Sequence, residues 1–308
     1  NGVDWLFTTY AERFKIDDEW FVRFPNKKGT IRIEPHADLL LKALTDSGVD
    51  PTREVQVQGQ AHQVGDLFRG SLSEAWFTPE TNTFSYSSSN DIPWSLQGLS
   101  SWADKGLSWT ASNGRSTSLD SLADFGLATL VENTRFLAAA KEQNIDFQKR
   151  GQGIFKFTCG GAHLIQGVAH ATARGFGDEA NRALIQEQLH LLMYRFPREL
   201  NQIDAAAKQH PAHRLKLRVQ RLKLTGHTLE TLHRVAAYRW LGPADKAAVE
   251  QVAAEVVKSV VLLHEIKAFD ALEQIKLKDE QLYLDIVGDA AHALRGLKIA
   301  TGDSAVYY

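Results

Sequence analysis

The sequence predicts a mainly α-helical protein, in which helical hairpins repeat to form an α/α-toroid-like or open array behind a small N-terminal α+β region. Three observations lead to this prediction. Long stretches with helical periodicity follow residue 118, a His-containing motif recurs at nearly constant intervals, and the composition changes near residue 115. We therefore expect a mixed, Trp-rich region at 1–115 and a helical-hairpin repeat domain at 116–308.

The recurring motif has the form His-x-x-x-Gly-aliphatic. The motif is complete around His163 and His292. Around His227 it keeps the histidine but lacks the glycine four residues later, and around Trp94 it keeps everything except the histidine. The four anchor residues are separated by 69, 64 and 65 residues. A period of this length is typical of stacked helical hairpins that cannot bury their apolar faces alone.

The composition narrows the class of protein. A chain of 308 residues with 44% hydrophobic content can bury a sizeable core. The formal net charge of −2 gives no basic field, so nucleic acid is not an expected partner. No apolar run is long enough for a transmembrane helix, and the single cysteine, Cys159, excludes an internal disulfide framework. The first residue is Asn1, which gives a weak preference for a periplasmic or secreted protein whose signal peptide has been removed.

The region 1–115 contains short strand-like and helical stretches. Residues 19–24 and 30–33 flank a polar turn at 25–29 and predict a β-hairpin. A helix is expected at 37–45, and the alternation at 54–58 predicts another strand. Strands this short cannot build a large sheet.

Six long helices are expected in the region 116–308. Ser118 and the Gly242–Pro243 pair are start signals, Gly175 is a stop signal, and Pro197 is expected to kink the third helix. The expected helices are 118–142, 154–174, 178–208, 213–239, 243–274 and 280–300.

Taken in pairs, these helices make three hairpins whose second helix always carries the motif. The second helices would line the inside of the array, and their small residues would let them approach closely. These small residues are Gly161, Gly167, Gly226, Gly288 and Gly296. The layout is similar to that of α/α-toroid enzymes such as glycan hydrolases and polysaccharide lyases, but none of the catalytic motifs of those families can be placed on this chain.

In such an array, His163, His227 and His292 occupy corresponding positions on three inner helices and would converge. Three imidazoles around one point are the ligands of a catalytic zinc or non-haem iron site with an open coordination position. Cys159 lies one helical turn before His163, so its thiolate could replace one imidazole.

Two carboxylates share a helix face with these histidines. Glu230 follows His227 by three residues, and Asp289 precedes His292 by three. Each is therefore a candidate proton acceptor, metal ligand or orienting partner of an imidazole. The competing interpretation is that histidines at a fixed place in a repeat serve packing or capping alone.

Two further features predict binding surfaces. Asp91, Trp94 and Trp102, beside the polar loop at 85–90, could stack on and hydrogen-bond to a substrate such as a glycan, and the loop could close the mouth of the pocket. The basic stretch 214–223 predicts either a solvated helix face or a contact with an acidic partner.

The sequence as a whole predicts a metal-dependent enzyme of hydrolase or lyase type, acting on a small-molecule, peptide or glycan substrate in a histidine-lined pocket. The alternative is a non-catalytic scaffold that binds a ligand or partner and uses its histidines structurally.

Overall fold

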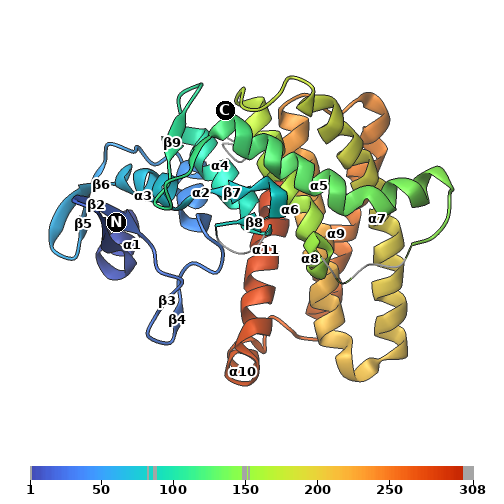
Figure 1. Ribbon diagram of the computed structural model, residues 1–308. Coiled ribbons are helices and arrows are strands. Elements are labelled where there is room, and N and C mark those ends of the chain that lie inside the picture. The colour runs from blue at the N-terminus through green and yellow to red at the C-terminus, as the bar shows by residue number, and fades with distance from the viewer. Residues whose placement is uncertain (1, 82, 86–88, 148–150, 152, 301–308) are drawn as a thin grey trace. The chain divides into compact units, whose positions relative to one another are not determined.

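The computed structural model describes residues 2–81, 83–85, 89–147, 151 and 153–300, and these are mainly helical (Figure 1). The chain forms two compact units. Among the described residues, unit 1 comprises the chain up to Thr129 together with Gly167–Arg182, and unit 2 comprises Leu130–Gln166 together with residues 183–300.

Unit 1 combines short helices with five separate two-stranded antiparallel sheets among its described residues. Its helices are α1 (Gly2–Tyr10), α2 (Leu39–Asp46), α3 (Asp66–Glu74), α4 (Ile92–Trp102) and the 3₁₀ turn η1 (Pro79–Thr81). Its strands are β1 (Glu12–Ile16), β2 (Glu19–Arg23), β3 (Lys27–Lys28), β4 (Ile31–Arg32), β5 (Glu54–Val57), β6 (Gln60–Gln63), β7 (Phe77–Thr78), β8 (Thr83–Phe84), β9 (Ser108–Thr110) and β10 (Ser116–Ser118).

The hairpin predicted between residues 19–24 and 30–33 is wrong. Strand β2 pairs with β1, and the segment β4 pairs with β3 instead. The turn between β1 and β2 contains Asp17, which has a φ of 52°, a left-handed conformation that Asp tolerates better than most residues. Glu12 accepts a hydrogen bond of 2.8 Å from Arg23, the residue opposite it in the register. These contacts between β1 and β2 therefore favour β1, and not β4, as the partner of β2.

Helix α4 is the buried centre of unit 1 and packs against α2 and α3. Pro93 stands in its first turn, where the missing N–H costs no hydrogen bond. At Gly98 a methyl group would lie 2.8 Å from Leu41 of α2, so the absence of a side chain permits this close packing.

Three helices run across the boundary between the units: α5 (Leu119–Glu142), α6 (Gly160–Ala173) and α7 (Asn181–Gln209). The remaining helices lie in unit 2: α8 (Arg214–Ala237), α9 (Lys246–Glu265), α10 (Leu272–Lys278) and α11 (Glu280–Ala300), with the 3₁₀ turns η2 (Gly153–Lys156), η3 (Pro211–His213) and η4 (Pro243–Asp245).

The predicted helices agree with these elements in order, with three differences. The stretch expected as one helix at 154–174 overlaps the 3₁₀ turn η2, and α6 begins only at Gly160. The stretch expected as one helix at 243–274 ends at Glu265, since Lys267 adopts a φ of 57°, and α10 follows separately. Helix α7 continues through Pro197 without interruption. Gly175 stands after α6 with a φ of 90°, as expected for a helix stop.

Helix α8 packs against both α9 and α11, and these helices run side by side in Figure 1. Two glycines make the contact with α11 close. A methyl group on Gly226 would lie 3.0 Å from the backbone N of Ala293, and one on Gly296 would lie 2.9 Å from the backbone N of Glu230. The predicted role of these two glycines is confirmed. A methyl group on Gly288 would meet nothing within 4 Å.

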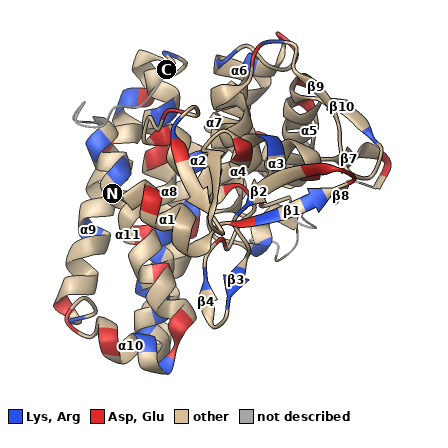
Figure 2. Cartoon of the chain, turned by 90° about the vertical axis from the view of Figure 1, so that its left-hand side faces the viewer, with Lys and Arg blue, Asp and Glu red and all other residues tan. Residues whose placement is uncertain are grey.

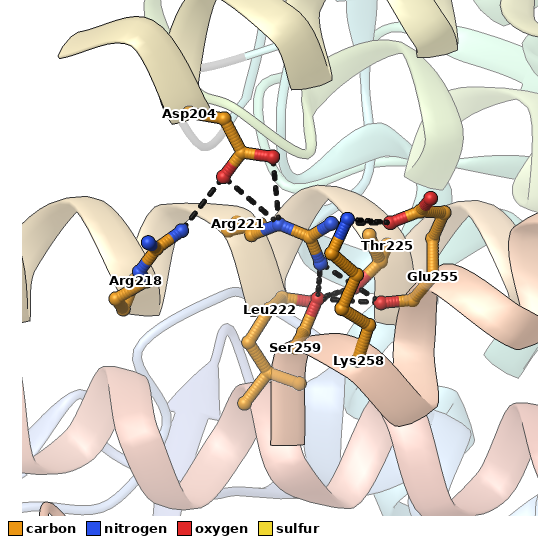
Figure 3. A network of polar contacts seen from close by, with 8 residues as sticks. All are labelled: Asp204, Arg218, Arg221, Leu222, Thr225, Glu255, Lys258 and Ser259. Atoms are coloured by element: carbon orange, nitrogen blue, oxygen red, sulfur yellow. Dashed lines mark hydrogen bonds and ion pairs between the residues drawn. The ribbon is translucent and has the colours of Figure 1, made fainter. Parts of the chain in front are cut away.

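A buried arginine connects α8 to α7 and α9 (Figure 3). The Arg221 side chain is 0% exposed and forms ion pairs with Asp204 of α7 and Glu255 of α9. It also donates hydrogen bonds to Ser259 Oγ and, at 2.9 Å, to the backbone oxygen of Glu255. These contacts satisfy the hydrogen-bond donors of the Arg221 guanidinium, which is not exposed to solvent.

The basic stretch 214–223 therefore meets acidic side chains of its own chain. Arg218 lies 2.7 Å from Asp204, and Lys216 lies 2.8 Å from Asp279. Lysines and arginines are likewise interspersed with aspartates and glutamates along α9 and α10 (Figure 2). An acidic partner for this stretch from outside the chain stays a prediction.

Candidate metal centre

Three helices of unit 2 bring three histidine rings together. His163 lies in the first turn of α6, His227 in the middle of α8, and His292 in the second half of α11. The ring centroid of His227 is 4.3 Å from that of His163 and 3.9 Å from that of His292, and the remaining pair is 5.2 Å apart. The close approach of α8 and α11 at Gly226 and Gly296 brings His227 and His292 together, with their ring planes tilted by 35°.

The donor atoms of Cys159, His163 and His227 all lie within 4.8 Å of one another, so this group could hold a metal ion. His163 and His227 are buried, and Cys159 is half-buried. Cys159 immediately precedes α6, and its backbone oxygen accepts from the His163 N–H at 3.3 Å, which places the two side chains about one turn apart. His292 lies beside this group without belonging to it.

His227 has the second partner that metal-ligating histidines usually have. Its Nε2 lies 3.0 Å from Oδ1 of Asp289, while its Nδ1 is buried with no hydrogen-bond partner in the described part of the chain. Burial, together with the neighbouring His292 and His163, holds the pKa of His227 well below its ordinary value. The ring is therefore neutral at physiological pH, as a metal ligand must be.

Asp289 lies between His227 and Lys223. Burial raises the pKa of Asp289 to about 8, although the Lys223 ammonium, 3.8 Å away, opposes this shift. Burial alone would lower the pKa of Lys223, but Asp289 and Asp285 outweigh it and raise that pKa. Without a further positive charge, Asp289 thus tends to keep a proton. A divalent cation beside His227 would favour the ionised carboxylate.

His292 is held by a second carboxylate. Its Nδ1 lies 2.6 Å from Oε2 of Glu230, whose side chain is 0% exposed. Oε1 of Glu230 faces two guanidinium groups, at 3.2 Å from Arg295 and 3.8 Å from Arg234. The His292 side chain is 22% exposed, against 4% for His227, so the cluster reaches solvent at His292.

Asp289 is expected to strengthen metal binding by fixing the His227 ring. Asp289→Ala should lower the affinity for Zn²⁺ by about 10–100-fold, since a carboxylate on the far nitrogen of a ligand histidine orients the ring and raises its basicity. The matched control is Asp285→Ala. Asp285 lies 3.2 Å from Lys223 and forms no hydrogen bond or ion pair with a histidine in the described part of the chain. Competition titration with a chromophoric chelator measures the Zn²⁺ affinity of both variants. Equal affinities would show that Asp289 does not contribute to metal binding.

The predicted substrate-binding residues lie in unit 1. Asp91 lines a cavity of about 510 Å³ and pairs with His36 at 3.0 Å. Trp94 is only 2% exposed, and its ring stacks on His36 at a centroid distance of 5.4 Å. Trp102 is half-buried at the end of α4. Residues 86–88 of the polar loop lie outside the described residues.

Asp38 lines the same cavity and carries a buried carboxyl group. It accepts hydrogen bonds from Ser71 and Ser95, yet burial raises its pKa to about 6. The folded protein therefore binds this proton more tightly than the unfolded chain does, and stability should fall as the pH rises from about 4 to about 6.

Asp38→Asn should flatten that pH dependence. The maximum effect is about 3 kcal/mol, the free energy of a shift of roughly two pKa units. Urea unfolding at several pH values measures it, and tryptophan fluorescence reports mainly on the first 110 residues, which hold six of the seven tryptophans. The exposed Asp18→Asn serves as control. An unchanged slope in Asp38→Asn would show that this carboxyl does not titrate as described.

Several charged residues beside the histidines were not predicted there, and Lys223 was assigned only to the basic stretch 214–223. Lys223 precedes His227 by four residues, and Arg295 follows His292 by three, so helical spacing alone would have placed them beside the cluster. Arg234 follows Glu230 by four residues, so helical spacing would have placed it beside Glu230 in the same way.

Comparison with protein-family models, curated proteins and solved structures gives no match for this chain. No helix within the described ranges is both long and apolar enough to cross a membrane.

Proposed function

We propose that the protein is a metal-dependent enzyme of the hydrolase or lyase type, with Cys159, His163 and His227 as the metal ligands. The observation that carries the proposal is the state of His227. Asp289 lies on one ring nitrogen, and the other is buried and has no hydrogen-bond partner among the described residues. The His227 ring also offers a nitrogen within ligand distance of Cys159 and His163. A buried polar atom in this position costs free energy unless a ligand satisfies it.

The donor set favours zinc. One thiolate and two imidazoles suit Zn²⁺, and three protein ligands leave a fourth tetrahedral position open for substrate or water. Iron, which the histidines alone would also suit, is less compatible with a set that contains one thiolate. When bound, such an ion supplies Lewis-acid chemistry and lowers the pKa of a coordinated water molecule.

The carboxylates beside the histidines would take part in proton transfer. Glu230 lies 2.6 Å from Nδ1 of His292 and would orient that ring, so that the imidazole could pass a proton between substrate or water and the carboxylate. Asp289 does the same for His227 and thereby fixes the nitrogen that faces the metal. Both carboxylates thus act as proton acceptors through an imidazole. Access for the substrate would be on the side of His292, the more exposed ring.

The proposal includes the arrangement of the helices around the metal ligands. Helices α6, α8 and α11 correspond to the second helices of the three predicted hairpins, and they would line the interior of an open array or toroid. A cleft between such helices suits a polymeric or peptide-like substrate. The convergence of one histidine from each helix supports this arrangement.

The test compares metal-free with zinc-loaded protein on chromogenic esters, peptide amides and glycosides. We expect turnover only in the loaded protein, and its loss in His292→Ala with little change in zinc affinity. Zinc binding without turnover on any substrate class would indicate a non-catalytic scaffold in which the metal and histidines are structural. Absence of zinc binding would reject the proposal altogether.

A further inference from the structure

One face of α11 is apolar and exposed, although another face of the helix packs closely against α8. Leu284, Val287 and Leu294 are 36%, 45% and 56% exposed, and Ala291 is exposed as well. The opposite face carries buried residues such as Ala293 and Gly296, which meet α8. Burying large aliphatic side chains is favourable, so an exposed row of them indicates a binding surface.

The spacing of these residues is that of a coiled-coil seam. Positions 284, 287, 291 and 294 alternate steps of three and four residues, and the exposed Glu280 and Lys298 continue the pattern at its two ends. Alternating steps of three and four place all six side chains along one stripe of a helix, which is the arrangement that packs against a second helix. We call these six residues the α11 seam.

The seam is symmetric about residue 289. Leu284 and Leu294 lie five residues to either side of it, Val287 and Ala291 lie two, and Glu280 and Lys298 lie nine. When two copies of the helix run antiparallel about this point, each leucine faces a leucine, each Val287 faces an Ala291, and each Glu280 faces a Lys298. A surface that is complementary to itself in this way fits a twofold dimer.

Gly288 supplies a second, independent argument. It stands inside the helix beside Val287, where a glycine costs about 1 kcal/mol relative to alanine. Within the described structure nothing lies within 4 Å of the position of its missing methyl group, in contrast to Gly226 and Gly296. The close approach of a second helix would account for this glycine.

From the seam, its symmetry and Gly288, we infer that the protein forms a homodimer through an antiparallel pairing of the α11 helices. The occupant of the apolar face is a second copy of this chain. The paired stripe is small for a protein interface, so a dissociation constant roughly in the micromolar range is expected. This inference does not depend on the metal site.

Sedimentation equilibrium of the full chain over a range of concentrations tests the dimer. Val287→Lys should raise the dissociation constant by about tenfold or more, because the twofold axis places the added charge in the seam twice. Val261→Lys on α9 is the matched control, since Val261 is 48% exposed, much like Val287. A monomer at all concentrations, or dissociation by Val261→Lys alone, would overturn the inference.

A charge exchange tests the antiparallel orientation. Glu280→Lys should weaken the dimer roughly threefold or more at low ionic strength, since like charges then face each other at both ends. The double variant Glu280→Lys, Lys298→Glu should restore it. Rescue cannot come from helix stability, because both changes oppose the helix dipole. Failure of the double variant to recover, with circular dichroism unchanged, would contradict antiparallel pairing.

Discussion

Substitution of His227 by alanine should lower the affinity for Zn²⁺ by more than about 100-fold, beyond the effect of removing a residue that only orients a ligand. His227 is 3% exposed, and its ring lies close to those of both His163 and His292. Its loss would remove the donor that Asp289 orients. Competition titration with a chromophoric chelator gives the affinity.

Two further variants make this result interpretable. His264→Ala removes an exposed histidine of α9 that forms no part of the cluster and should leave the affinity unchanged. Cys159→Ser is nearly isosteric and should abolish the thiolate-to-metal charge-transfer absorption of Co²⁺-loaded protein, with little change in the circular dichroism spectrum. Equal zinc affinity in His227→Ala and the unsubstituted protein would mean that the cluster is not the metal site.

Arg221→Ala should destabilise the protein by about 3–5 kcal/mol, the usual cost of leaving the partners of a buried ion pair without their counter-charge. The substitution removes the one guanidinium that joins α7, α8 and α9 at Asp204, Glu255 and Ser259. Urea unfolding followed by circular dichroism measures the loss.

Arg218→Ala provides the comparison for this prediction. Arg218 is 15% exposed at its side chain and pairs with Asp204. Because the pair is partly solvated, its removal should cost only about 1 kcal/mol. If the two variants lose the same stability, burial of Arg221 is not what makes its network strong.

The convergence of the three histidines could be predicted from the sequence, because the recurring motif places them at nearly even intervals on helical segments. Evenly spaced histidines are expected to meet where such segments pack side by side. The roles of Gly226 and Gly296 followed from the same argument, because a glycine within a helix indicates a close neighbour.

Other features depend on which elements become neighbours, and local patterns do not encode that. The strand β2 had two candidate partners, and the turn at Asp17 decided between them. The apolar stripe of Leu284, Val287 and Leu294 resembles a core-facing stripe in the sequence. Only the structure shows that α11 uses its other face, with Ala293 and Gly296, to meet α8.

The most direct test of the metal centre is the metal itself. Protein purified without a histidine tag should contain close to one equivalent of zinc or another first-row transition metal per chain. X-ray absorption at the metal edge should show one sulfur and two imidazole nitrogens in the first shell, from Cys159, His163 and His227. A protein that neither contains nor takes up such a metal, or one whose metal has no sulfur ligand, would contradict the account.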